Sequence, residues 1–279
     1  MEPCAFVTAV LYRLGINPLA VANIPINAVC RCGKVHDYSS PKDIINCNQA
    51  GGCTWIARHN YPARTFARIA KEAGHTVLME EKTGGIFNNG KVDVTILDFV
   101  KEPLKNKKGS VQGSKVCAHF DFRVTDPTNK SNSAGRSFRG KAADKHAKEK
   151  YSSAGALHVM APDIFIPAIL ETYGLVHIDL RKALFCIAEN HIYQSVKDNG
   201  FSDDDKNILK GIIVNEYYQR LSVSLMKGIA MNIQTSARIV MKNNLGGYSR
   251  RAPPLTHARA QAKLGAKERG ESSGLAQLA

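Results

Sequence analysis

The segment 116–125, VCAHFDFRVT, alternates apolar and polar side chains along its length. A period of two is typical of a β-strand whose two faces meet different surroundings. One face carries Phe120, Phe122 and Val124, and the other carries His119, Asp121 and Arg123. The pattern therefore predicts a sheet with an apolar core on one side of this strand and charged groups on the other.

The segments around this strand predict alternating helices and strands. Helices are expected over 61–73, 137–153, 178–195 and 203–243, strands over 76–80, 91–99, 116–125 and 163–174, and a short helix or strand over 4–14. The resulting order, α-β-β-β-α-β followed by helices, indicates the α/β fold class. No apolar run approaches the ~18 residues of a membrane-spanning helix, so we expect a chain without a membrane segment.

Positive charge is concentrated in two parts of the chain. The net charge is +14; residues 101–150 contribute +8, as 13 Lys/Arg minus 5 Asp/Glu, and residues 242–279 contribute +5, as 7 minus 2. A surplus that serves solubility alone would be spread evenly, whereas focal patches suit a polyanionic backbone. DNA is the expected partner and RNA the second candidate; basic segments without a ligand remain the alternative.

Two aspartates are expected to meet on the sheet. Asp93 lies in the strand 91–99, on the face opposite Val92 and Val94, and Asp121 lies on the polar face of 116–125. Neighbouring carboxylates repel unless a cation lies between them, and oxygen ligands suit Mg²⁺ or Mn²⁺. Such an ion can activate water against a phosphodiester. The pair predicts metal-dependent phosphodiester hydrolysis, with ordinary structural aspartates as the alternative.

A lysine on the helix 137–153 is expected to face the sheet. Lys150 shares its helix face with Ala143 and Ala147, whereas Lys141, Lys145 and Lys148 lie on another face. An inward lysine needs an anionic partner, and Asp121 is the natural one. A lysine whose stem merely covers apolar surface is the alternative interpretation.

Cysteines crowd into the stretch 30–60, which lacks helical or strand periodicity. Four such ligands brought together by tight turns are typical of a zinc site. The expected ligand set is Cys30, Cys32, Cys47 and His59, with His36 or Cys53 as substitutes. Small buried cysteines without a metal are the alternative.

The order and spacing of these motifs resemble a known family, the C-terminal region of site-specific non-LTR retrotransposon proteins. In that family a zinc knuckle precedes a restriction-like endonuclease of the PD-(D/E)XK class. The resemblance spans residues 10–240 and rests on CRCG (30–33), NCNQAGG (46–52), ARHN (57–60), VLMEE (77–81), VDVTI (92–96), FDFRVTDP (120–127), AADKHAKEKY (142–151), FIPAILETYG (165–174) and LSVSLMKG (221–228).

The resemblance implies roles for individual residues. Asp93 and Asp121 match the two acidic metal ligands, Lys150 the catalytic lysine displaced to a helix, Glu80 an acidic residue of the first strand, and Arg58 a basic residue at the first helix. Three positions depart from the pattern: Val92 replaces a proline, Arg123 stands where simpler members keep the lysine, and Asp43 replaces a histidine before the third cysteine, where it can ligate zinc instead.

Together these features predict a Mg²⁺- or Mn²⁺-dependent DNA endonuclease of retroelement origin that nicks a target strand. The alternative is a catalytically decayed, zinc-stabilised nucleic-acid-binding protein. Expected phosphate contacts are Arg58, Lys101, Lys105, Lys107, Lys108, Arg123, Lys141, Lys145 and Lys148. We expect no membrane partner and no small-molecule substrate, a nuclear location inside the cell, and a reverse transcriptase on a separate or parent chain as partner.

The same motifs divide the chain into five regions. These are a lead segment (1–29), a zinc-knuckle-like module (30–60), a restriction-like endonuclease domain (61–195), a helical region (196–243) and a disordered basic tail (244–279).

Overall fold

We analysed a computed structural model of the chain, which describes residues 3–18, 55–79, 92–100, 115–128, 140–152, 159, 162–195 and 201–245. The chain divides into two compact units, Met1–Met241 and Lys242–Ala279, and the candidate site lies in the first. Most of the predicted zinc module, residues 101–114, and residues 246–279 of the predicted tail 244–279 lie outside the described residues.

The described strands form one mixed sheet in the order β1-β2-β3-β4. They are β1 (Val77–Met79), β2 (Val94–Val100), β3 (Lys115–Thr125) and β4 (Ile164–Glu171). The pairs β1–β2 and β2–β3 are antiparallel, whereas β3 and β4 are parallel. A parallel pair needs a crossover connection, and α5 (Lys141–Tyr151) lies on that connection. The predicted α/β class is confirmed.

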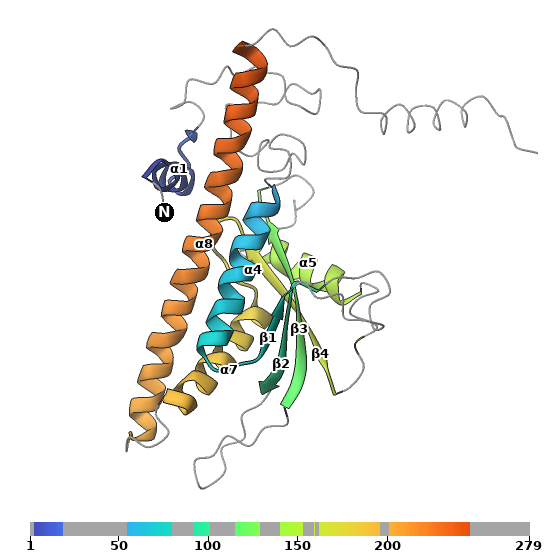
Figure 1. Cartoon of the computed structure of the whole chain (residues 1–279), viewed down its shortest axis with the longest axis vertical. Coiled ribbons are helices and arrows are strands. Elements are labelled where there is room, and N and C mark those ends of the chain that lie inside the picture. The colour runs from blue at the N-terminus through green and yellow to red at the C-terminus, as the bar shows by residue number, and fades with distance from the viewer. Residues whose placement is uncertain are drawn as a thin grey trace, which may run out of the picture. The chain divides into compact units, whose positions relative to one another are not determined.

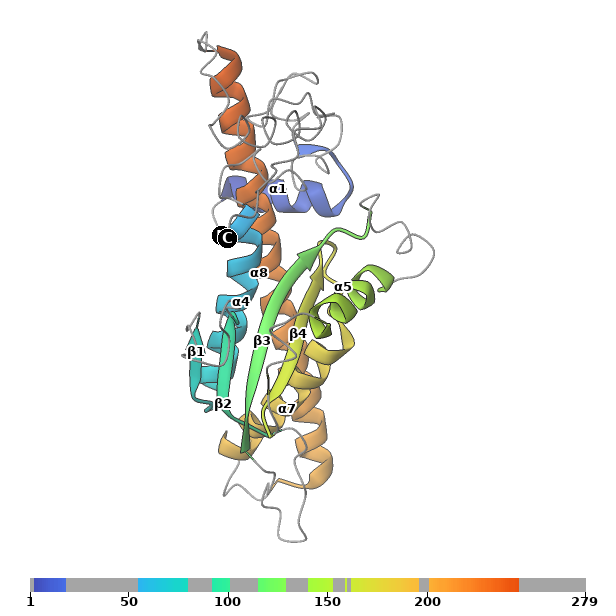
Figure 2. The ribbon, with the colours of Figure 1, turned by 90° about the vertical axis from the view of Figure 1, so that its right-hand side faces the viewer.

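The two faces of the sheet are covered by different helices. α4 (Trp55–Glu72), α7 (Ile178–Ser195) and α8 (Asp203–Leu245) lie on one face, and α5 lies on the other (Figure 1, Figure 2). Strand β4 shows the division: Ala168 and Leu170 belong to the large core, but Ile169 packs with Ala143 and Ala147 of α5. Because the side chains of successive strand residues point to opposite faces, the helices on each face contact every second residue of β4.

On the large-core face, aromatic rings join α4 to the sheet. Phe66 of α4 packs against Phe120 and Phe122 of β3, with ring centroids 4.6 and 5.4 Å apart. The predicted inward face of β3 is thus confirmed. Burying a phenylalanine side chain contributes roughly 1.5–3 kcal/mol, so these three rings are a main anchor between helix and sheet.

Helix α8 crosses α4 at a glycine. A Cβ placed on Gly228 would lie 2.6 Å from Cα of Arg58 and 2.9 Å from the carbonyl oxygen of Ala57, so only glycine allows this approach. Helix α1 (Pro3–Arg13) also contacts α8, because Nη2 of Arg13 donates a 2.6 Å hydrogen bond to Oγ of Ser222. The start of α4, directly before His59, is therefore held close to α8.

Several predicted boundaries are wrong. β4 ends at Glu171 rather than at residue 174, and α8 continues to Leu245, which lies in the predicted disordered tail 244–279. α4 begins at Trp55 rather than at residue 61, so Arg58 and His59 are helical although they fall in the predicted zinc module. The helix continues through Pro62, which lacks only its own main-chain donor. Strand β2 begins at Val94 rather than at residue 91, and Asp93 occupies a bend before it.

One polar side chain of β2 is buried. Thr95 is buried, 3 % exposed, and its hydroxyl lies 3.1 Å from Nδ1 of His119, which is also buried. β2 and β3 are the interior strands of the sheet, and Leu97 in the middle of β2 is nevertheless 40 % exposed. None of the helices in the described residues is both long and apolar enough to cross a membrane.

Candidate active site

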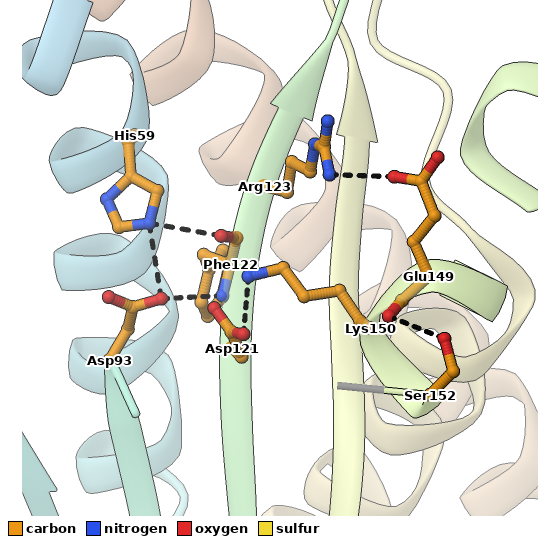
Figure 3. A network of polar contacts seen from close by, with 8 residues as sticks. All are labelled: His59, Asp93, Asp121, Phe122, Arg123, Glu149, Lys150 and Ser152. Carbon is orange, nitrogen blue, oxygen red and sulfur yellow. Dashed lines mark hydrogen bonds and ion pairs between the residues drawn. The ribbon is translucent and has the colours of Figure 1, made fainter. Parts of the chain in front are cut away.

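Asp121 and Lys150 form an ion pair between β3 and α5 (Figure 3). Both side chains are about one-fifth exposed. Asp121 is on the α5 face because its register partner on β4 is Pro167, two residues from Ile169, which packs against α5. The contact predicted for Lys150 is present, and its catalytic role stays a prediction.

Asp93 is tied to β3 on both sides of Asp121. Its main-chain nitrogen donates a 3.0 Å hydrogen bond to the carbonyl oxygen of Phe120. Its Oδ2 accepts a 2.6 Å hydrogen bond from the main-chain nitrogen of Phe122. Because Phe120 and Phe122 flank Asp121, the carboxylate of Asp93 lies beside the residue expected to share a cation with it. The structure thus brings together the two predicted carboxylates.

The charge balance around Asp121 is unusual for a carboxylate. Burial raises the pKa of Asp121 above its ordinary value, and the nearby charge of Asp93 raises it further. Lys150 and His59 lower this pKa, but they do not overcome the effect of burial. Such a half-buried carboxylate beside a second one favours additional positive charge, and a shifted pKa of this kind is typical of functional sites.

His59, which the sequence predicted to be a zinc ligand, lies at this carboxylate site. Its Nε2 is 3.2 Å from Oδ2 of Asp93 and 3.1 Å from the carbonyl oxygen of Phe122, and its Nδ1 is 2.9 Å from Oδ1 of Asn60 (Figure 3). Burial lowers the pKa of His59, but the hydrogen bonds to Asp93, Asn60 and Phe122 outweigh it, so the net pKa is raised. Of the expected zinc ligands, His59 alone falls within the described residues.

The donor atoms at this site suit a hard divalent cation. Asp93 and Asp121 offer carboxylate oxygens, the ligand type that Mg²⁺ and Mn²⁺ prefer, with water completing the coordination. Among the described residues no group of three His, Cys, Asp or Glu side chains is already arranged around a common metal position. Two carboxylates with water as the remaining ligands are a donor set that fits Mg²⁺.

A second polar cluster connects α5 to β3 beside the carboxylates. Nη1 of Arg123 donates a 3.0 Å hydrogen bond to Oε2 of Glu149, and Nδ1 of His146 lies 2.7 Å from the same oxygen. Glu149 and His146 were not among the residues predicted for the site. Their spacing of three residues on a helix was the signal, because side chains at that spacing are neighbours.

The exposed side of α5 carries the predicted phosphate contacts. Lys141, Lys145 and Lys148 are exposed and line an open hollow of about 780 Å³ together with Asp144, Glu149 and Ser152. Arg123 is held by Glu149 at the edge of this helix. Three lysines among the residues that line this hollow suit phosphate groups.

Arg58 directly precedes His59 in α4 and is half-buried. Burial lowers its pKa, while the nearby carboxylate of Asp126 opposes this in part. Asp126 is itself buried and accepts a 2.9 Å hydrogen bond from the main-chain nitrogen of Thr128. Arg58 therefore lies near a buried carboxylate, and its contact with DNA stays a prediction.

The remaining predicted site residues lie outside the described residues. They are Cys30, Cys32, His36, Asp43, Cys47, Cys53, Glu80, Lys101, Lys105, Lys107 and Lys108. Comparison with known proteins adds no assignment, since no family model matches the chain and no curated protein is significantly similar to it.

Proposed function

We propose that the protein is a metal-dependent DNA endonuclease that hydrolyses phosphodiester bonds and nicks one strand of its target. The observation that carries the proposal is the position of Asp93, whose main chain and carboxylate bond to both neighbours of Asp121. The contact of Lys150 with Asp121 supplies a cation at the same place. Two carboxylates and a lysine on adjacent elements are the groups that metal-assisted phosphodiester hydrolysis needs.

Each residue has a distinct role in this proposal. Asp93 and Asp121 would hold Mg²⁺ or Mn²⁺, which when bound supplies a Lewis acid and a more acidic water. Lys150 would leave Asp121 as the cation enters and neutralise an oxygen of the scissile phosphate, where negative charge grows in the transition state. Lys141, Lys145 and Lys148 would bind the neighbouring phosphates and position the strand.

The resemblance to retrotransposon endonucleases extends the proposal beyond the described residues. A zinc knuckle formed by Cys30, Cys32 and Cys47, a nuclear location and a reverse transcriptase partner all rest on that resemblance. His59 is engaged elsewhere, so we propose that His36, Asp43 or Cys53 completes the zinc set.

A second candidate function is DNA or RNA binding without cleavage. The observation that favours it is the pairing of each carboxylate with a cationic or hydrogen-bonding side chain, Asp93 with His59 and Asp121 with Lys150. Such a network can serve the fold without a metal.

Plasmid nicking separates the two functions. Supercoiled DNA is incubated with the protein and Mg²⁺ or Mn²⁺, or with EDTA, beside a D93N/D121N double variant. We expect metal-dependent nicking that the double variant lacks. Asp98→Asn is the matched control, because Asp98 lies on β2 but bonds to the main-chain nitrogen of Thr76. Binding without cleavage under every metal would favour the second function.

A further inference from the structure

We propose that His59 is a positioning residue of the carboxylate site, which holds Asp93 and the β3 main chain at Phe122 in the geometry that binds the divalent cation. This inference rests on the proposed nuclease function. It differs from the zinc role that the sequence predicted for His59, and it assigns the start of α4 to the active site.

The hydrogen-bond geometry defines the role of the imidazole. Nε2 faces two acceptors, Oδ2 of Asp93 at 3.2 Å and the carbonyl oxygen of Phe122 at 3.1 Å. A ring nitrogen between two acceptors must carry the hydrogen, so Nε2 donates. The imidazole therefore acts on the carboxylate as a donor, and Nδ1 is fixed in turn by Asn60 at 2.9 Å.

His59 and Asp93 both form hydrogen bonds with the main chain of Phe122 on β3. The main-chain nitrogen of Phe122 donates to Asp93, and its carbonyl oxygen accepts from His59. The three groups form a closed ring of hydrogen bonds next to Asp121. Removing the imidazole opens the ring and lets the Asp93 carboxylate rotate.

The ring also holds one oxygen of the Asp93 carboxylate. Within the described part of the chain, both hydrogen bonds of the Asp93 carboxylate go to Oδ2. Oδ1 carries neither of these hydrogen bonds, and Oδ2 is the oxygen on the side of Asp121 (Figure 3). Carboxylates that bind a metal are typically oriented by hydrogen bonds from neighbouring groups. Losing one such hydrogen bond lowers metal affinity or activity about 10- to 100-fold.

Partial burial makes the interaction effective. The side chains of His59 and Asp93 are 26 % and 18 % exposed, so water competes less for the hydrogen bond than it would on an open surface. The backbone of α4 is also fixed at this point, because Gly228 of α8 packs against Arg58 and Ala57. His59 thus approaches the sheet from a rigid support.

Mn²⁺ binding, measured by calorimetry on the full-length protein, tests the inference without relying on cleavage. Wild type is compared with His59→Ala and His59→Gln, and a D93N/D121N variant measures Mn²⁺ bound elsewhere. We expect His59→Ala to weaken Mn²⁺ binding at the carboxylates about 10- to 100-fold. His59→Gln should recover most of the affinity, because its amide nitrogen can donate from nearly the same place as Nε2.

The matched control is the second histidine–aspartate pair between α4 and β2. Nδ1 of His75, just after α4, lies 3.3 Å from Oδ1 of Asp98, away from the site. His75→Ala should bind Mn²⁺ as wild type does, even if it melts at a lower temperature. A merely structural role for His59 would make the two alanine variants behave alike, and that result overturns the inference.

The outcomes separate this inference from the proposed function. If His59→Ala binds Mn²⁺ as strongly as the wild type does, the proposed role of His59 is overturned and the nuclease proposal still stands. His59→Gln as weak as His59→Ala also overturns it, because donation from Nε2 would then not be what matters. If the wild type binds no more Mn²⁺ than D93N/D121N, the nuclease proposal falls and this inference falls with it.

Discussion

Asp93 accepts a 2.6 Å hydrogen bond at its carboxylate from the main-chain nitrogen of Phe122. Because Phe122 directly follows Asp121, this hydrogen bond to the main chain holds the carboxylate of Asp93 beside Asp121. The side chain of Asp93 replaces a main-chain acceptor at the position where β2 has not yet begun. The carboxylate is therefore part of the sheet and part of the candidate site.

The variants Asp93→Ala and Asp93→Asn should show how much the Asp93 carboxylate contributes to the stability of the sheet, apart from its place in the candidate site. Phe122 is buried, 2 % exposed, so the alanine variant leaves its main-chain nitrogen without the acceptor and should lower the free energy of unfolding by about 1–3 kcal/mol. Asparagine keeps an acceptor oxygen and should cost less. Urea unfolding measures both. Equal destabilisation by the two substitutions would mean that the carboxylate is not needed as an acceptor.

Gly228→Ala should destabilise the protein, because the new Cβ meets main-chain atoms of α4 at 2.6 and 2.9 Å and neither helix can yield locally. Overpacking of this kind costs about 1–3 kcal/mol. Gly211→Ala on the same helix is the control: no atom lies within 4 Å of its added Cβ, and alanine should stabilise α8 by roughly 0.5–1 kcal/mol. Denaturant midpoints that shift in the same direction for both variants would contradict the close crossing.

Replacing Lys141, Lys145 and Lys148 with glutamine should weaken DNA binding on the α5 face. Each lysine that no longer neutralises a phosphate should reduce the slope of log affinity against log salt by roughly 0.9. Fluorescence anisotropy at several salt concentrations measures the slope. A control variant with Lys182 and Lys206 replaced removes charge from α7 and α8 and should keep the wild-type slope. A triple variant with an unchanged slope would move the DNA-binding surface away from α5.

His119 should make the protein less stable in acid. Burial lowers the pKa of His119 below its ordinary value of 6.5, with Asp163 opposing this in part. Below pH 6.5 the unfolded chain takes up the proton first, so the stability contribution of neutral His119 is complete above 6.5 and is lost as the pH falls toward the folded pKa.

The variant His119→Asn tests this pH dependence, because asparagine retains a polar group near Nδ1, facing Thr95. Thermal melting in EDTA from pH 8 to pH 5 should show a wild-type stability that declines more steeply below 6.5 than that of the variant. The difference between the two proteins cancels the other titrating groups. Parallel curves over the whole range would show that His119 does not titrate with folding.

Local pattern was sufficient for the elements of the fold. The alternation in 116–125 predicted β3 and its inward phenylalanines, and helical spacing predicted that Lys150 faces the sheet. These predictions succeed because the period of a strand or helix is set by the backbone, and burial of one face then selects which residues are apolar. The same reasoning placed Asp121 correctly on β3, but it placed Asp93 inside a strand, whereas Asp93 lies in the bend before β2.

Tertiary structure decided the details that turn this sheet into a candidate site. Asp93 stands before β2 rather than in it, and its partner Phe122 is set by the pairing of two strands that a long connection separates. His59 reaches the site only because α4 begins at Trp55 and is fixed by Gly228 of α8. A cysteine- and histidine-rich stretch favoured a zinc role for His59, because sequence spacing contains no information about the strand that a helix later contacts. Periodicity is a local property, whereas the hydrogen bonds that orient a carboxylate depend on which distant segments pack together.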